Sequence, residues 1–332
     1  MIFKIEIEDM EVYNLTDLKK RVTTGVVGIL LLILIFCIGL NAVKVFILLL
    51  TLEAIRELYN AFLKKGIKLF LPILFFGALI TFLCTYFNLN LVYALIIYFV
   101  VNSVFSIIIE DYSVENYLYT SFSYFYAVFM LNVLASINDI YLIISAFVIS
   151  FSTDTFAYFV GSTFGKHKLI ERISPNKSVE GSIGGTVFAL IITSIYFILM
   201  NKYITNYNID FFVILIILIS SISGQFGDLF ASKLKRYVDI KDYAQILPGH
   251  GGVLDRFDSL IFISPFIFIL YNIIWGRNNG YFNKFSYSFS SSSNASWIWT
   301  FYSCEIIWNK SKRIFNWHGP QNFSKRKKGN HL

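Results

Sequence analysis

Charged residues are scarce in this chain of 332 residues. Asp, Glu, Lys and Arg together make up 15% of it, whereas hydrophobic residues make up 56% and aromatic residues 18%. A soluble domain of ordinary composition has about 25% charged residues, so the usual soluble globular class is excluded. The mean hydropathy of +0.63 agrees with this. We therefore expect an integral membrane protein.

Cysteine is also rare, with Cys37, Cys84 and Cys304 standing far apart in the sequence. This number and spacing exclude a disulfide framework and a cysteine-ligated metal cluster. The chain also lacks the GxxxxGK[ST] motif, which excludes a P-loop nucleotidase.

Long apolar runs are what the chain has in abundance, and they recur to about residue 275. A helix needs about 20 mostly apolar residues to cross a hydrocarbon core of about 30 Å. Helices are expected because they satisfy their own backbone hydrogen bonds in lipid. The runs are approximately 22–40, 43–62, 69–87, 89–109, 118–136, 140–162, 183–200, 211–231 and 259–275. The expected fold class is all-α, a polytopic integral membrane protein of about nine transmembrane helices.

The chain divides by composition into a polar N-terminal segment (1–21), a polytopic membrane catalytic domain (22–275) and a basic, Ser-rich C-terminal tail (276–332). Lys and Arg cluster in four segments that fall on one side of nine spans. These segments are 18–21, 64–68, 166–172 and 232–258. The positive-inside rule makes that side cytoplasmic. We therefore expect a cell inner membrane or its equivalent, with the active site facing the cytoplasm.

The tail carries the positive charge of the chain. From Arg277 onward it has nine Lys and Arg and one acidic residue, Glu305. Subtracting this +8 from the total of +7 leaves −1 for the rest, so no nucleic-acid partner is expected. Three interpretations remain open: a tenth span near 295–308, a disordered segment, or a reading frame that is not native. A nonfunctional tail is the favoured prediction.

The stretch ILPGHGGVLDRFDS (246–259) is unexpectedly polar for its position before the last apolar run. Asp228 lies inside an apolar run, and Asp255 and Asp258 lie at the start of the next one. A carboxylate within the membrane costs a few kcal/mol, so it needs a partner or a task. Carboxylates without cysteine ligands suit Mg²⁺. Asp228 and Asp255 are therefore the candidate metal ligands, and a second, monovalent cation stays an option.

Basic and glycine residues surround these carboxylates. Lys235, Arg236, Lys241 and Arg256 offer donors that suit phosphate. The glycines of GHGG let the backbone approach a ligand closely and supply amide donors. Each basic residue alone would more often be a topology signal or a lipid contact. Together with the carboxylates, the set predicts a phosphoryl or nucleotidyl transfer site.

The stretch from Ser232 through Asp258 resembles the signature of the phosphatidate cytidylyltransferase (CDP-diacylglycerol synthase) family. The matching positions are Ser232, Lys235–Arg236, Lys241–Asp242, Pro248 through Gly252, Asp255–Arg256 and Asp258. The segment SPNKSVEGSIGG (174–185) resembles a second family motif, in which Asn176 and Ser178 are departures. Asn176 removes a positive charge, and Ala231 stands where a glutamate is common. The resemblance covers about residues 18–275 and excludes the tail.

The resemblance implies an enzyme that transfers CMP from CTP to phosphatidic acid at the surface of a lipid bilayer, giving CDP-diacylglycerol and pyrophosphate. It implies Mg²⁺ on Asp228 and Asp255, and it leaves a homodimer as a candidate assembly. The implied catalytic residues are Asp228, Asp255, Lys235, Arg236 and Arg256. The implied substrate-binding residues are Ser174, Lys177, Ser178, Ser232, Lys241, His250, Gly251 and Gly252, with Lys177 expected on the triphosphate.

Two other functions are compatible with parts of the sequence. A transporter or channel would explain membrane-embedded Asp154 and Asp228 with glycines nearby. Against this, the polar residues gather at one membrane face, and no inverted repeat is visible. The second alternative is a lipid phosphotransferase of another family, acting with a different nucleotide or a polyprenyl phosphate.

Overall fold

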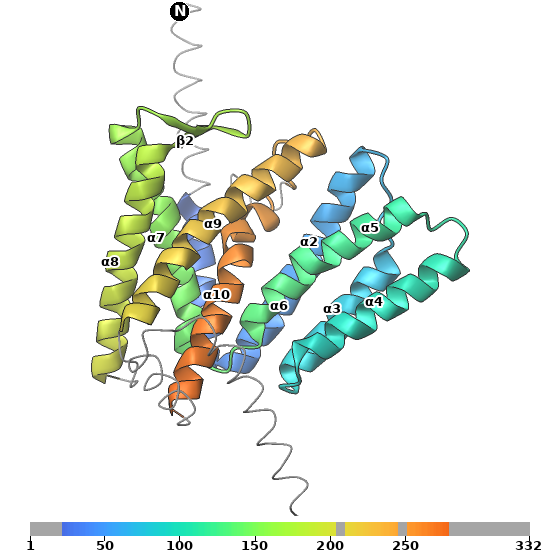
Figure 1. Ribbon diagram of the computed structural model, residues 1–332, viewed down its shortest axis with the longest axis horizontal. Helices are drawn as coiled ribbons and strands as arrows, with labels where there is room; N and C mark the ends of the chain where they lie inside the picture. The colour runs from blue at the N-terminus through green and yellow to red at the C-terminus, as the bar shows by residue number, and fades with distance from the viewer. Residues whose placement is uncertain (1–21, 204–209, 245–250, 279–332) are drawn as a thin grey trace, which may run out of the picture. The chain divides into compact units, whose positions relative to one another are not determined.

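The computed structural model describes residues 22–203, 210–244 and 251–278, and the side chains up to Ile274 (Figure 1). Packing divides the chain into two units, Met1–Ile274 and Trp275–Leu332. The fold and the site belong to the first unit. The prediction for His250 lies outside the described residues, as does every interpretation of the tail beyond Asn278.

A helix forms at each of the nine apolar stretches in the described residues. In chain order these are Val22–Ile38, α2 (Leu40–Lys64), α3 (Leu71–Tyr86), α4 (Leu91–Ile108), α5 (Val114–Ser123) continued through the π-helix η1 (Tyr124–Phe129) into α6 (Met130–Ala135), α7 (Ile140–Phe164), α8 (Val179–Tyr203), α9 (Phe211–Tyr237) and α10 (Leu254–Asn278). The long apolar runs explain the helices, because only hydrogen bonding within the segment satisfies their backbone in lipid.

Six helices of the described chain are long and apolar enough to cross a membrane, by length and composition. They are Leu91–Ile108, Val114–Ala135, Ile140–Phe164, Val179–Tyr203, Phe211–Tyr237 and Leu254–Ile274. The helices Val22–Ile38 and Leu71–Tyr86 are apolar but shorter. Helix α2 has 25 residues but carries Glu53, Arg56 and Glu57 near its C-terminal end. The chain is thus a helical membrane protein with at least six helices of spanning length.

A short hairpin between α7 and α8 is the exception to the all-α expectation. Strands β1 (Lys168–Ile170) and β2 (Ser174–Ser178) pair in antiparallel fashion. The carboxylate of Glu180, at the start of α8, accepts the backbone N–H of Lys166 at 3.1 Å and that of His167 at 3.2 Å. This polar segment is too short and too charged to continue α7. The hairpin therefore folds back over the start of α8 (Figure 1).

Small residues bring the helices that carry the polar side chains close together. A Cβ on Gly185 would lie 2.6 Å from the Thr153 carbonyl oxygen of α7, and one on Gly227 of α9 would lie 2.6 Å from the Asp258 carbonyl oxygen of α10. Neither position has space for a larger residue, as in other closely packed membrane helices. Helices α7 and α8 run side by side in Figure 1. These contacts place α7, α8, α9 and α10 around one polar region.

Candidate active site

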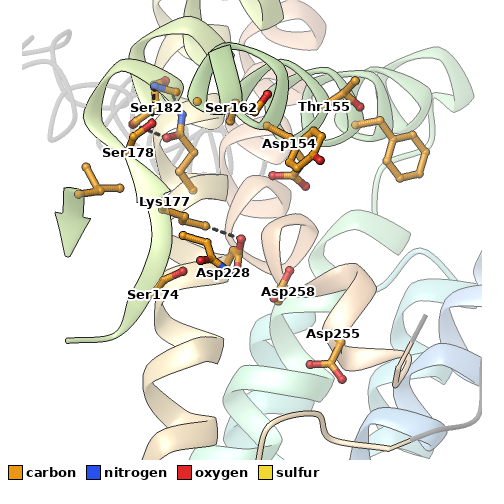
Figure 2. Close-up of a pocket in the computed structure, with 18 of the residues that line it drawn as sticks. Asp154, Thr155, Ser162, Ser174, Lys177, Ser178, Ser182, Asp228, Asp255 and Asp258 are labelled. Atoms are coloured by element: carbon orange, nitrogen blue, oxygen red, sulfur yellow. Dashed lines mark hydrogen bonds and ion pairs between the residues drawn. The ribbon is translucent and has the colours of Figure 1, made fainter. Parts of the chain in front are cut away.

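A cavity of about 670 Å³ lies among the hairpin and helices α7, α8, α9 and α10 (Figure 2). Four carboxylates line it: Asp154 from α7, Asp228 from α9, and Asp255 and Asp258 from α10. Basic side chains reach it from three elements, namely Lys177 of β2, Lys235 of α9 and Arg256 of α10. A cavity that contains both signs of charge at this density suits a phosphate ligand and a cation.

Asp228 is the more exposed of the two carboxylates that are predicted to bind a metal. Its Oδ2 forms an ion pair with Lys177 Nζ, drawn as a dashed line in Figure 2. Its Oδ1 lies 3.5 Å from the Ser232 hydroxyl, one helical turn further along α9. The side chain is 30% exposed. Asp228 is therefore reachable from the cavity, and Lys177 is the group that a ligand would have to displace.

Asp255 has a different environment, because both of its oxygens are engaged. Oδ1 accepts from Lys235 Nζ at 2.7 Å, and Oδ2 accepts the backbone N–H of Tyr243 at 2.9 Å and of Gly252 at 3.0 Å. The side chain is 7% exposed. Burial raises the pKa of Tyr243, and the negative charge of Asp255 adds to this effect. Asp255 thus joins the end of α9, the connecting loop and the first turn of α10.

The structure brings together seven of the residues that the sequence predicted to be catalytic or substrate-binding. The lining of the cavity includes Asp228, Asp255, Lys235, Arg256, Ser174, Lys177 and Ser178. Ser232 contacts Asp228 without lining the cavity. Arg236 and Lys241 are exposed and do not line it. Of the two neighbouring basic residues at the end of α9, Lys235 therefore belongs to the cavity and Arg236 does not.

The glycines after His250 shape the turn before α10. Gly251 has a φ of +82°, a conformation that side chains rarely adopt. The amide of Gly252 is bound to Asp255 within the protein. The expectation that both glycines offer amides to a substrate therefore does not describe Gly252 in this state. Its amide holds the turn together.

The donors in the cavity fit a hard cation such as Mg²⁺, because they are carboxylate and hydroxyl oxygens without sulfur. Beside Asp258 the hydroxyl of Ser259 is buried and adds a further oxygen. Within the described residues, however, no three His, Cys, Asp or Glu side chains lie close enough together to form a ready-made metal site. The carboxylates would have to move together for such a cation to bind, and Lys177 would have to leave Asp228.

Two residues that organise the site were not predicted from the sequence. Gln225 of α9 lines the cavity, and its Nε2 donates to Thr186 Oγ1 of α8 at 2.8 Å. Glu57 of α2 is fully buried, and its carboxylate accepts the backbone N–H groups of Val253 and Leu254. A signal for Glu57 was present in the sequence: an acidic residue within an apolar run needs a partner. The partner itself lies 196 residues away.

Comparison with known proteins identifies a family over the part of the chain that contains the apolar helices. The profile of the Cytidylyltransferase family matches residues 19–274. The chain is 49% identical to the phosphatidate cytidylyltransferase of Bacillus subtilis (strain 168) over 126 residues, which are 38% of this chain and 45% of that protein. It is 41% identical over 155 residues to the protein of the same name in Staphylococcus haemolyticus (strain JCSC1435), or 46% of this chain and 55% of that one. The alignments span about half the length of these relatives. The family match covers more than half of the chain, which therefore belongs to the cytidylyltransferase family.

Proposed function

We propose that this protein is a phosphatidate cytidylyltransferase, which transfers CMP from CTP to phosphatidic acid and releases pyrophosphate. The observation that carries the proposal is the cavity in which Lys177, Lys235 and Arg256 stand among four carboxylates. Relatives named for this activity share up to 49% identity with part of the chain. The membrane helices around the cavity suit a lipid substrate, because its acyl chains can stay in the bilayer while its phosphate reaches the polar region.

We also propose nine spans, a cell inner membrane or equivalent, a site facing the cytoplasm and a homodimer. The Lys and Arg clusters at 18–21, 64–68, 166–172 and 232–258 support the orientation. Helices at all nine apolar stretches support the number of spans. CTP and Mg²⁺ are available on the cytoplasmic side, so this orientation gives the site access to both.

The reaction requires charge neutralisation more than proton transfer. A phosphate oxygen of phosphatidic acid attacks the α-phosphorus of CTP, a new P–O bond forms, and the bond to the β-phosphate oxygen breaks. The nucleophile is already an anion near neutral pH, so no strong protein base is needed. Two anions must be aligned and screened from each other. Lys235 and Arg256 stand at the cavity for this task.

Asp228 and Asp255 would hold Mg²⁺, which when bound would screen the triphosphate and stabilise the charge that develops at the α-phosphorus. Asp228 is one of the two proposed metal ligands because its side chain is exposed to the cavity. Lys177 would exchange Asp228 for the triphosphate as the nucleotide enters, since both partners of this pair are partly exposed. A second, monovalent cation is compatible with the remaining carboxylates, Asp154 and Asp258.

The proposal is tested with CTP labelled at the α-phosphate, added to the purified protein with phosphatidic acid and Mg²⁺. We expect the label in a chloroform-soluble product. A transporter would leave all of the label water-soluble, and this result would refute the proposal. Replacing CTP with other labelled nucleoside triphosphates, and phosphatidic acid with a polyprenyl phosphate, distinguishes the proposed enzyme from a different lipid phosphotransferase.

A further inference from the structure

Glu57 is the buried carboxylate that the proposed chemistry does not use. It lies on α2, has an exposed fraction of 0%, and does not line the cavity. Its neighbours on α2 are buried apolar residues, including Ala54, Ile55 and Leu58. Among the described residues, none of the ion pairs includes it. An acidic side chain in such surroundings is costly unless hydrogen bonds to the charged form offset its desolvation.

The N-terminus of α10 supplies those hydrogen bonds. Glu57 Oε1 accepts the backbone N–H of Val253, and Oε2 accepts that of Leu254, both at 2.7 Å. The first amides of a helix have no partner within the helix, and the helix dipole favours a negative charge beside them. Glu57 therefore caps α10 from another helix, across almost 200 residues of sequence.

Two carboxylates together fix the first turn of α10. Glu57 binds the amides of Val253 and Leu254, while Asp255 binds the amide of Gly252. A Cβ on Gly252 would lie 2.7 Å from Glu57 Oε1, so the carboxylate occupies the space that a side chain would need. Each of the three consecutive amides is thus held by a carboxylate. Asp255, Arg256 and Asp258 follow directly and line the cavity.

We propose that Glu57 is a positioning residue, which holds the turn 252–254 so that Asp255, Arg256 and Asp258 face the substrates. It does not touch the reacting atoms. This role in catalysis rests on the proposed function, whereas the cap itself can be tested by hydrogen exchange without any activity. A shift of about 1 Å in such a turn can cost a transfer reaction about a hundredfold.

Glu57→Gln tests this because the amide group keeps the size but presents a donor to one backbone N–H. We expect kcat to fall by about tenfold to a hundredfold, with a smaller rise in the KM for CTP. Glu57→Asp keeps the charge and should retain more activity than Glu57→Gln. The matched control is Glu53→Gln one turn earlier on α2, whose carboxylate pairs with the exposed Arg56. This control should behave as the unaltered protein.

Amide hydrogen exchange gives a readout that does not depend on catalysis. In Glu57→Gln the peptide containing Val253 and Leu254 should exchange faster, while the peptide of the distant α3–α4 turn (87–90) is unchanged. If exchange at 253–254 stays the same, the proposal is wrong. If exchange is faster in Glu57→Gln but the unaltered protein transfers no CMP, the cap by Glu57 is confirmed and the proposed function is refuted.

A double variant tests whether Glu57 acts through this turn. Gly252→Ala alone should be damaging because of the Glu57 carboxylate. Glu57→Ala removes the carboxylate, so the double variant should be no less active than the worse single variant. If the two losses multiply, Glu57 acts elsewhere. Unchanged kcat and KM in Glu57→Gln, with only a lower melting temperature, would likewise reduce Glu57 to a structural cap and overturn the proposal.

Discussion

Asp228 on α9 and Asp255 on α10 are two carboxylates of one cavity in different surroundings. Asp228 is 30% exposed and forms an ion pair with Lys177. Asp255 is 7% exposed and has three donors, of which two are backbone amides. One carboxylate is thus free to change partners, and the other is part of the structure that carries it. To bind the proposed cation, Asp228 would exchange Lys177, whereas Asp255 would have to give up Lys235 or a backbone amide.

The largest effect is expected for Asp228→Asn. Removing its charge removes several kcal/mol of cation-mediated stabilisation, so turnover should fall by about a thousandfold or more. The melting temperature should change little, since the side chain is partly exposed and its pair with Lys177 is screened. The loss of turnover is measured over a Mg²⁺ titration, and the melting temperature is measured by thermal unfolding in the same detergent. Near-normal activity at any Mg²⁺ concentration would show that Asp228 does not hold the metal.

Asp255→Asn should reduce both activity and stability, which is where it differs from Asp228→Asn. The change leaves the part-buried Lys235 without its carboxylate, and the cost should approach, without reaching, the about 3–5 kcal/mol lost on breaking a fully buried ion pair. Adding Lys235→Met should recover much of this stability without recovering activity. Thermal unfolding of the single and double variants measures the loss of stability and its recovery. A melting temperature for Asp255→Asn as high as that of Asp228→Asn would remove the distinction between the two carboxylates.

Arg256→Lys examines the ligand side of the α10 turn that Asp255 holds. The planar guanidinium can bind two phosphate oxygens at once, whereas an ammonium cannot. Since a charged hydrogen bond contributes about 1.5–3 kcal/mol, kcat/KM should fall by about tenfold or more. Stability should be unchanged, because the charge is preserved and the side chain is exposed. Steady-state kinetics with unchanged thermal unfolding would support this, and full activity would count against a phosphate contact.

Lys177→Ala examines the movable partner of Asp228. Losing one charged contact to the triphosphate should raise the KM for CTP by roughly tenfold, with a smaller effect on kcat. Lys168→Ala is the matched control on the same hairpin, because Lys168 Nζ donates to the Pro175 carbonyl oxygen and does not line the cavity. If the KM for phosphatidic acid rises and that for CTP does not, Lys177 binds the lipid headgroup instead.

The positions of the helices were predictable from the sequence because long apolar runs leave the backbone few alternatives in lipid. The gathering of Lys177, Asp228 and Arg256 was predictable only from motif resemblance, since these residues come from three separate elements. The antiparallel hairpin was not predicted. Its short polar strands have no apolar periodicity, and a carboxylate at the start of α8 holds them in place.

The division of labour between the two aspartates could not be read from the sequence. Both follow the same rule, an acidic residue at the end of an apolar run. What separates them is tertiary: the Tyr243 and Gly252 amides reach Asp255, and Glu57 reaches the same turn from α2. Contacts over such separations leave no local pattern. The sequence motif likewise contains both Lys235 and Arg236, and only Lys235 lines the cavity.

Removing the tail is expected to have the smallest effect. A chain ending at Asn278 keeps all of α10, and every partner named above for Asp228 and Asp255 lies before that residue. The composition changes near this point, from a net charge of −1 over residues 1–276 to +8 over residues 277–332, and truncation at such a boundary costs little when no buried backbone is lost. Activity and membrane insertion should therefore stay as in the full chain. The competing idea is that residues 297–308 lie at the membrane interface and return the basic residues 325–328 to its anionic inner surface. Labelling of Asn330→Cys from the cytoplasmic side, together with a loss of activity on truncation, would favour that idea and would extend the site beyond the two carboxylates compared here.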